Sequence, residues 1–226
     1  MSVQDRAAAS SAKRAAKAGA PARRPRARVH NRDREEDILV AARTVFEARG
    51  FDAASVAEIA KLSRVAEGTI YLYSATKREL LQKVVARWYE GLIAEIEQGL
   101  AQRVGAEAKL RYFADRHLRL HAEDAAIGRL TVRELRSAPD YPASGLHALN
   151  RRYTRLFTAI IDAGILGGEI DASVRPEIAR DVFFGALEHL GLGGMGGGAW
   201  RRDAAAAFFA LFWRAVARGG PTRDAD

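Results

Sequence analysis

The chain has 226 residues, and its 36 lysines and arginines against 28 acidic residues give a formal net charge of +8. It has no cysteine, which excludes disulfides, thiolate metal sites and cysteine nucleophiles. No apolar run reaches the ~20 residues that cross a bilayer, and the basic N-terminus lacks the apolar segment of a secretory signal. These features favour a cytoplasmic protein without a membrane partner, and the basic balance makes nucleic acid a candidate partner.

The excess positive charge lies in one segment. Residues 1–32 contain nine basic side chains and one acidic side chain, whereas residues 33–226 contain 27 of each. Residues 1–32 also have almost no large apolar side chain to offset the entropy of ordering, so we predict a disordered basic tail. This tail is either a solubilising leader or an arm that binds DNA phosphates beside a sequence-reading domain.

After residue 32 the pattern is helical. Asp33, Glu35, Glu36 and Asp37 are expected in the first turn of the first helix, where the helix dipole favours acidic groups. Gly50 is expected to end that helix in a left-handed cap. One face of the helix is apolar and predicts the side that packs inward: Ile38, Leu39, Ala42, Val45 and Phe46.

Two Ser/Thr-x-x-Glu patterns predict the starts of further helices. Ser55 with Glu58 predicts a capping box that opens a short second helix, and Thr76 with Glu79 predicts one that opens a long helix to about Leu100. A break near Ser63 and Arg64 separates the second helix from a short third helix over residues 67–73. The long helix has an apolar stripe made of Leu80, Leu81, Val84, Trp88, Leu92 and Ile96.

Five more helices are expected, over residues 106–121, 124–137, 144–164, 176–191 and 201–218. The glycine-rich stretch 191–198 between the last two predicts a flexible connection. The fold class is therefore all-α with about nine helices. We expect a domain of three short helices over residues 33–80 and a larger helical domain over residues 81–220, and the long helix joins the two. We also expect a disordered C-terminus over residues 221–226.

The stretch 34–83 resembles the N-terminal DNA-binding domain of the tetracycline-repressor (TetR) family of transcriptional regulators. Its markers are the first helix with Phe46 and Gly50, the pair Ile59-Ala60, and the run Gly68-Thr69-Ile70-Tyr71 followed by Lys77 and Leu80. The resemblance implies a helix-turn-helix whose helix 67–73 enters the major groove, a homodimer, a palindromic DNA operator, and release by a small-molecule effector.

The resemblance also assigns candidate DNA contacts by position. Tyr and Thr hydroxyls reach phosphate oxygens without a long flexible stem, and a lysine at the start of the long helix would clamp a phosphate. We expect one of the two tyrosines to contact DNA more than the other, because they point to different sides of a helix. The candidates are Ser55, Arg64, Glu67, Gly68, Thr69, Tyr71, Tyr73 and Lys77.

Two positions depart from the family pattern. The family usually places glycine in the helix-turn-helix turn, where this chain has Arg64, so this turn either tolerates a side chain or carries strain. Arg64 could alternatively contact a phosphate. The family usually has an aromatic residue, most often Phe, where this chain has Ser74, which predicts thinner packing between the recognition helix and the long helix.

The larger domain is expected to bind the effector and to form the dimer. Apolar walls with spare arginines predict a hydrophobic or amphipathic effector, with or without an acidic group. The candidate effector residues are Trp88, Tyr89, Tyr112, Phe113, Arg116, His117, Arg133, Tyr153 and Phe157. The last two helices carry more aromatic side chains than one inward face needs, which predicts a dimer interface: Phe183, Leu187, Leu190, Phe208, Leu211, Phe212 and Val216.

Two alternatives compete with a ligand-responsive repressor: an enzyme and a sequence-independent nucleic-acid binder. An enzyme is disfavoured, because the chain has no HExxH and no glycine-rich phosphate loop on a strand. His117 and His121, four residues apart, could share a metal with Glu123, Asp124 or His189, but two histidines do not complete a site, so we expect no metal or cofactor. A sequence-independent nucleic-acid binder that uses the basic tail is the main alternative.

Overall fold

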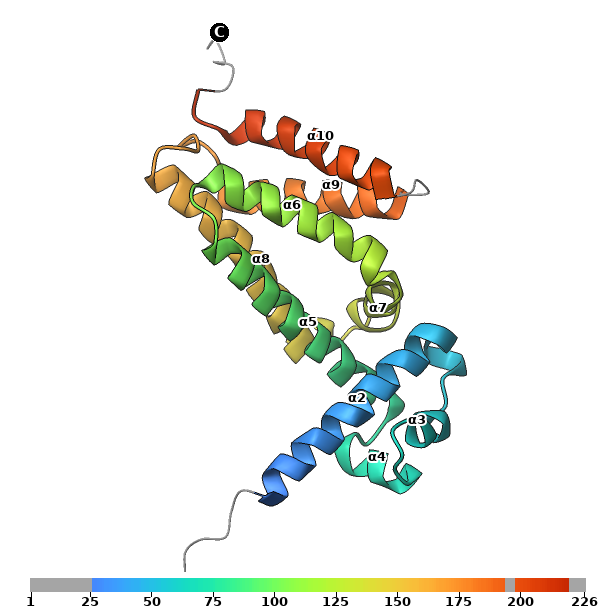
Figure 1. The fold of residues 1–226 in the computed structure, drawn as a ribbon. Helices are drawn as coiled ribbons and strands as arrows, with labels where there is room; N and C mark the ends of the chain where they lie inside the picture. The colour runs from blue at the N-terminus through green and yellow to red at the C-terminus, as the bar shows by residue number, and fades with distance from the viewer. Residues whose placement is uncertain (1–25, 194–197, 220–226) are drawn as a thin grey trace, which may run out of the picture. The chain divides into compact units, whose positions relative to one another are not determined.

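A computed structural model describes residues 26–193 and 198–219, with the side chains of residues 33–191 and 203–219. Ile38–Asp226 form one compact unit, and the sites below lie within it. Within the described residues there are nine α-helices, and the only β-pairing is an isolated bridge between Ile170 and Ala217. The all-α prediction is therefore confirmed (Figure 1).

The helices follow one another closely along the chain. The α-helices are α2 (Arg26–Ala53), α3 (Val56–Leu62), α4 (Glu67–Tyr73), α5 (Lys77–Ala101), α6 (Ala106–Glu123), α7 (Ala125–Leu130), α8 (Gly145–Leu166), α9 (Pro176–Gly193) and α10 (Gly198–Val216). Two shorter elements lie between α7 and α8: a π-helix, η2 (Thr131–Arg136), and a 3-10 helix, η3 (Tyr141–Ala143).

The first helix differs from its prediction at both ends. It begins at Arg26, so residues 26–32, which were expected in the disordered tail, are helical, and the acidic cluster at residues 33–37 does not lie in the first turn. The rest of the predicted tail lies outside the described residues. Gly50 interrupts the helix with φ 75° and ψ 177°, an extended conformation that only glycine adopts readily, and helical residues continue to Ala53.

The two predicted capping boxes have different outcomes. Ser55 is the N-cap residue of α3, but its side chain accepts no capping hydrogen bond. The Glu58 carboxylate lies 3.6 Å from the Arg49 guanidinium. At α5 the prediction is confirmed, because the Thr76 hydroxyl accepts a hydrogen bond from the Glu79 amide at 3.0 Å. The Glu79 carboxylate accepts in turn from the amide of Ala75 at 2.8 Å, one residue before the cap.

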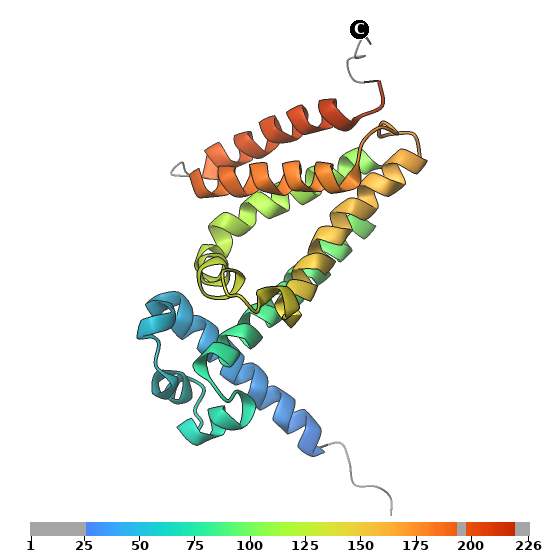
Figure 2. The ribbon, with the colours of Figure 1, turned by 180° about the vertical axis from the view of Figure 1, so that it is seen from behind.

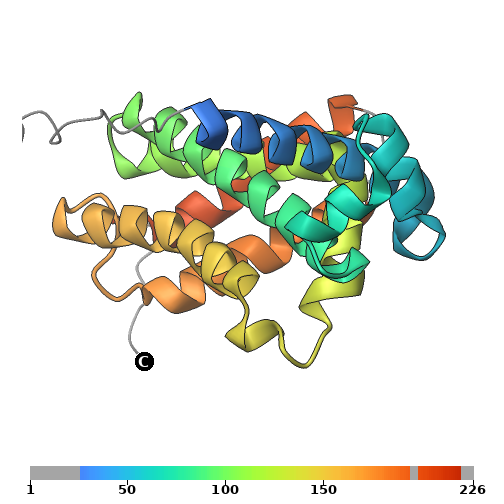
Figure 3. The same cartoon turned by 90° about the horizontal axis from the view of Figure 1, so that it is seen from below.

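The helical body is built on α5 and α8, which run side by side (Figures 1 and 2). Helix α6 packs on α8, α9 and α10, and α9 and α10 lie against each other. The predicted helix 124–137 is divided, because its second half is π-helical, and the chain from α7 to α8 forms a loop at the edge of the body (Figure 3). Helix α9 continues through Gly193 and α10 begins at Gly198, so both ends of the predicted glycine-rich connection are helical, and its residues 194–197 lie outside the described residues.

Candidate DNA-binding surface and effector-binding core

Helices α3 and α4 form the helix-turn-helix, and α4 covers the residues predicted for the recognition helix. Its Ile70 is 1% exposed and anchors the helix to the core, whereas Tyr71 is 49% and Leu72 84% exposed. Glu67 and Gly68 are exposed in its first turn. Leu72 was not among the residues predicted from the sequence, although its position two residues from the inward-facing Ile70 places it on the opposite side of a helix.

The two tyrosines of α4 are in different environments. Tyr71 is the more exposed, while Tyr73 is half-buried and its backbone carbonyl accepts a hydrogen bond from the Lys83 ammonium. Thr69 is also half-buried, and Ser55 is exposed at the start of α3. Tyr71 is therefore the better placed of the two to reach a ligand outside the protein.

Arg64 occupies the turn between α3 and α4 with φ 57°, and it is the one residue other than glycine with positive φ in the described part of the chain. The left-handed region costs an L-residue with a side chain roughly 1–2 kcal/mol, so the turn carries the strain expected from the missing glycine. The side chain is exposed on the α3–α4 side, where it could also meet a phosphate.

An Arg64→Gly variant is expected to be as stable as the natural protein or more stable by up to about 1 kcal/mol. The released strain exceeds the ~0.5–1 kcal/mol that glycine adds to the entropy of the unfolded chain. Urea unfolding followed by circular dichroism measures this change. Lys61→Gly, in the last turn of α3, is the matched control and should destabilise the protein by about 1 kcal/mol. A similar loss of stability in Arg64→Gly would contradict the assignment of backbone strain to Arg64.

Lys77 does not present its ammonium group as a free phosphate clamp. Its Nζ donates to the backbone carbonyls of Asp52 at 3.0 Å and Ala54 at 3.1 Å, and it lies 4.8 Å from the centre of the Phe51 ring. The side chain therefore ties the start of α5 to the segment that follows the Gly50 kink. In this geometry the lysine is a structural link, and the phosphate contact expected from the sequence stays a prediction.

Ser74 is 2% exposed, and its hydroxyl has no hydrogen-bond partner among the described residues. A polar atom in this position costs free energy, since it loses water without gaining a partner. The residue therefore fills, with a small polar side chain, a buried position between α4 and α5. This agrees with the expectation that packing at this position is thinner than an aromatic ring would make it.

The aromatic core of the helical body consists of rings from α6, α8, α9 and α10: Phe113, Tyr153, Phe157, Phe183, Phe184, Phe208 and Phe212. The Phe157 and Phe183 rings lie 4.5 Å apart, and the Phe113 ring lies 5.3 Å from that of Tyr153. Phe113, Phe157 and Phe183 have no exposed surface. Residues predicted for two different roles, effector binding and dimerisation, thus form one continuous core.

Four of the seven predicted dimer residues are buried inside the subunit: Phe183, Leu187, Phe212 and Val216. In each adjacent Phe pair one ring is buried, and the other, Phe184 or Phe208, is half-buried and contacts Phe183. Leu190 is half-buried as well. Of the predicted set, Leu211 is exposed, at 69%.

His117 and Tyr153 form the polar part of the core. His117 Nδ1 lies 2.8 Å from the Tyr153 hydroxyl, and both residues are more than nine-tenths buried. Beside them, Arg116 makes two hydrogen bonds to Glu95, at 2.6 and 2.8 Å, which hold the pKa of that carboxyl below its ordinary value. Burial raises the pKa of the Tyr153 hydroxyl well above its ordinary value.

The other predicted effector residues lie apart from this pair. Tyr112 packs between α5 and α6 with its hydroxyl on the carbonyl of Glu95, and its ring would clash with any side chain at Gly99. The Tyr89 hydroxyl lies 3.3 Å from Asn150 Oδ1, and the Trp88 ring stands edge-on to Tyr89. The structure therefore brings together Phe113, Arg116, His117, Tyr153 and Phe157, and not the complete predicted set.

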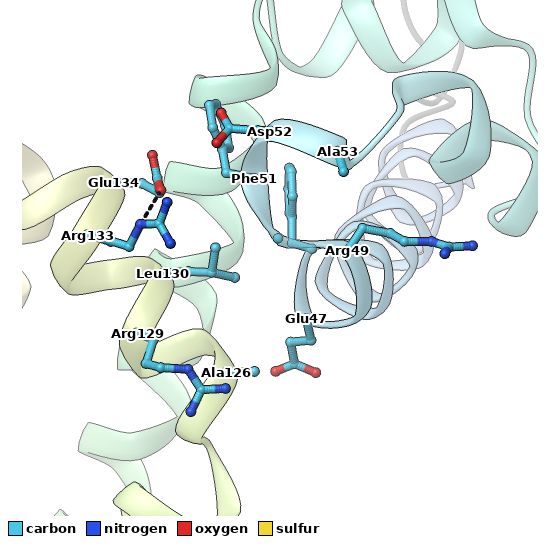
Figure 4. Close-up of a pocket in the computed structure, with 12 residues that line it drawn as sticks. Glu47, Arg49, Phe51, Asp52, Ala53, Ala126, Arg129, Leu130, Arg133 and Glu134 are labelled. Atoms are coloured by element: carbon cyan, nitrogen blue, oxygen red, sulfur yellow. Dashed lines mark ion pairs between the residues drawn. The ribbon is translucent and has the colours of Figure 1, made fainter. Parts of the chain in front are cut away.

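A pocket of about 380 Å³ lies where the end of α2 faces α7 and η2 (Figure 4). Leu130 and Phe51 supply apolar surface, while Arg133 pairs with Glu134 at 3.5 Å. Its lining carries as many acidic as basic residues, and Arg133 is its one predicted effector residue. Nearby, Arg43 of α2 and Asp124 before α7 form an ion pair at 2.6 Å that joins the helix-turn-helix region to the helical body.

Comparison with known proteins places this arrangement in a family. Residues 38–84 match the family model described as "Bacterial regulatory proteins, tetR family", and residues 103–214 match "Tetracyclin repressor-like, C-terminal domain". Together the two models cover well over half of the chain. The chain belongs to the TetR family. It is a ligand-responsive transcriptional regulator with an N-terminal DNA-binding helix-turn-helix, and the repressor prediction is supported.

The individual relatives have low sequence identity to this chain. The chain is 28% identical over 151 residues to the fatty acid metabolism regulator protein of Bacillus subtilis (strain 168), covering 67% of this chain and 78% of that protein. The transcriptional regulator FadR from Bacillus subtilis, solved in complex with stearoyl-CoA, matches with a TM-score of 0.69 and 24% identity, over 83% of this chain and 99% of that one. FadR from Bacillus halodurans matches with a TM-score of 0.63, 23% identity and the same coverage. These two structures show the shared fold.

Within this TetR-family chain, three further features bear on function. The described helices include none long and apolar enough to cross a membrane. Among the described residues no three potential ligands cluster in a way that could hold a metal ion. His117 and His121 do lie close, with ring centres 5.6 Å apart, but Asp124 is paired with Arg43 and Glu123 lies 3.6 Å from Arg116.

His117 gives the stability of this regulator a predicted pH dependence. Burial, followed by the charges of His121 and Arg116, lowers the pKa of His117 to about 3. Below pH ~6.5 the unfolded chain therefore takes up a proton that the folded chain does not, and the free energy of unfolding falls towards pH 3 by up to about 1.4 kcal/mol per pH unit. Urea unfolding between pH 7.5 and 5 should show a shallower loss in His117→Gln. Equal slopes in the two proteins would contradict this assignment.

Proposed function

We propose that this regulator is a homodimer that binds a palindromic operator through α4 and is released by a long-chain acyl thioester. The exposed face of α4 carries the DNA-binding part of the proposal. Ile70 and the α3–α4 turn fix the helix to the core, while Tyr71 and Leu72 project outward. A tyrosine hydroxyl suits a phosphate oxygen, and an exposed leucine suits the methyl group of thymine in the major groove.

A second copy of the chain is the proposed partner of α9 and α10. Ile178 and Val182 of α9 are 49% and 55% exposed, and Leu211 of α10 is 69% exposed. Gly185, Ala207 and Ala210 are exposed on the same helices and are small enough to allow close approach. To bind successive major grooves of a palindromic operator, a two-fold dimer needs its two α4 helices about 34 Å apart. This exposed set replaces the buried residues predicted from the sequence.

The effector class is proposed from the core and from a relative. The rings of α6, α8 and α9 offer a wholly apolar environment for a long chain, bordered by the polar pair His117 and Tyr153. The curated relative is named as a regulator of fatty acid metabolism. An acyl chain suits the apolar rings, and its thioester end suits the polar border. A regulator of this kind would act in the cytoplasm, where its operator lies.

Selection of operator sequences from random duplex DNA with the purified protein tests the DNA-binding proposal. We expect a palindrome whose half-sites lie one helical turn apart, and dissociation of the complex by stearoyl-CoA. Tyr71→Ala and Leu72→Ala should each weaken operator binding about tenfold, whereas Val104→Ala, at a 93% exposed position outside α4, should not. Equal affinity for operator and random duplex would favour the sequence-independent binder instead.

The basic N-terminal segment is expected to strengthen operator binding through its charge. Residues 33–90, which include the helix-turn-helix, carry nine basic and ten acidic side chains, so their net charge gives little attraction for DNA. Removal of residues 1–25, with six basic side chains, should weaken binding and flatten its dependence on the logarithm of salt concentration. A variant with those six residues changed to Gln is the matched control for length. An unchanged salt slope in both would support the solubilising role.

A further inference from the structure

His117 has one ring nitrogen engaged and one without a partner. Nδ1 faces the Tyr153 hydroxyl at 2.8 Å, whereas Nε2 is buried and has no hydrogen-bond partner among the described residues. The imidazole is enclosed by other rings: Phe184 at 5.1 Å, His121 at 5.6 Å and Tyr153 at 6.0 Å between ring centres. A buried polar atom left in this state costs stability, and such atoms are rare in folded proteins.

The Tyr153 contact decides what Nε2 can offer. A phenol is a stronger acid than a neutral imidazole N–H, which favours the tautomer in which the Tyr153 hydroxyl donates and Nδ1 accepts. The single proton of the neutral ring then lies on Nε2. Burial holds the pKa of His117 near 3, which keeps the ring neutral at physiological pH. Nε2 is therefore an uncharged hydrogen-bond donor at the edge of an apolar core.

A charged group is a poor match for this donor. A carboxylate in this position would be desolvated among aromatic rings. The neighbouring Arg116 is already paired with Glu95 through two hydrogen bonds, and its remaining nitrogen, Nη1, has no hydrogen-bond partner among the described residues and lies 3.6 Å from the Glu123 carboxylate. A neutral carbonyl oxygen has a much lower cost of burial and can accept from Nε2. An acyl thioester, which has a neutral carbonyl, should therefore bind here more tightly than the free fatty acid with the same chain, which has a carboxylate.

We propose that Nε2 of His117 donates a hydrogen bond to the thioester carbonyl of the effector, and that Tyr153 is the positioning residue that fixes the proton there. This inference rests on the proposed acyl-thioester effector. The acyl chain would run from His117 towards Phe113 and Phe157, which adjoin the pair on α6 and α8. These rings fill the region in the structure, so entry of the chain requires a ring to move, and Phe184 is the partly exposed ring closest to His117.

Three ligands with the same chain length test the proposal by isothermal titration calorimetry on the full chain. They are stearoyl-CoA, the thioether S-octadecyl-CoA, which lacks the carbonyl, and stearate. We expect stearoyl-CoA to bind about tenfold more tightly than the thioether, and stearate to bind more weakly than stearoyl-CoA. In His117→Phe the two CoA ligands should bind with equal affinity.

Conservative variants separate recognition from a loss of folding. His117→Gln keeps a neutral donor and should retain part of the preference for the thioester, while Tyr153→Phe should reduce it about threefold. His147→Phe, at a half-buried histidine of α8, is the control and should retain the full preference. If the natural protein binds stearoyl-CoA and the thioether equally, the His117 proposal is overturned and the effector class stands. If it binds neither, the effector class fails together with the proposal.

Discussion

A Leu211→Arg variant is expected to be monomeric and to bind the operator at least about a hundredfold more weakly than the natural protein. Leu211 is 69% exposed on α10, beside the exposed face of α9 that we assign to the second copy. An arginine there would bury an unpaired charge in an apolar interface. Because a monomer can engage one half-site at a time, it loses the gain that comes from linking two binding events.

The same substitution elsewhere provides the control. Leu166 is 91% exposed at the end of α8, outside the proposed interface, so Leu166→Arg should leave both the dimer and the operator affinity unchanged. Light scattering after size-exclusion chromatography measures the oligomeric state, and fluorescence anisotropy measures the affinity. A dimeric Leu211→Arg protein with full operator affinity would exclude this face of α9 and α10.

The dimer residues predicted from the sequence depended on how many helices pack against α9 and α10. The adjacent pairs Phe183-Phe184 and Phe208-Phe209 indicated an excess of aromatic surface, since neighbouring residues on a lone helix point about 100° apart. The structure accommodates all four, because α9 and α10 also pack on α6, whose Phe113 and Arg111 contact Phe184 and Phe209. The number of neighbouring helices decides how wide a buried face is, and the sequence does not state that number.

The helix-turn-helix could be predicted in more detail, because it depends on local signals. Helix 67–73 was predicted with the observed bounds, and Arg64 at the family's glycine position marked the turn that the structure holds at positive φ. The π-helix at Thr131–Arg136 has no comparable signal, because its residues fit an α-helix equally well. The polar pair His117 and Tyr153 was in the predicted effector set, but their contact joins residues 36 positions apart and needed the fold.

A Lys77→Met variant is expected to lose about 2 kcal/mol of unfolding free energy. Met keeps most of the hydrocarbon stem but removes the charged hydrogen bonds to the carbonyls of Asp52 and Ala54, and the contact with the Phe51 ring. Urea unfolding followed by circular dichroism, without DNA, measures the loss. Arg78→Met, at the next position of the same helix turn, is the matched control and should change stability by less than about 0.5 kcal/mol.

The salt dependence of operator binding separates this structural role from the predicted phosphate clamp. A residue that contacts a phosphate adds about one to the slope of log affinity against log salt, and its removal lowers the slope by that amount without affecting the protein alone. If Lys77 instead ties α5 to the end of α2, Lys77→Met should weaken binding with the slope preserved, because α4 would be held less firmly on the same contacts. Full stability with a slope reduced by one would mean that Lys77 leaves its carbonyl partners for the DNA backbone when the operator binds.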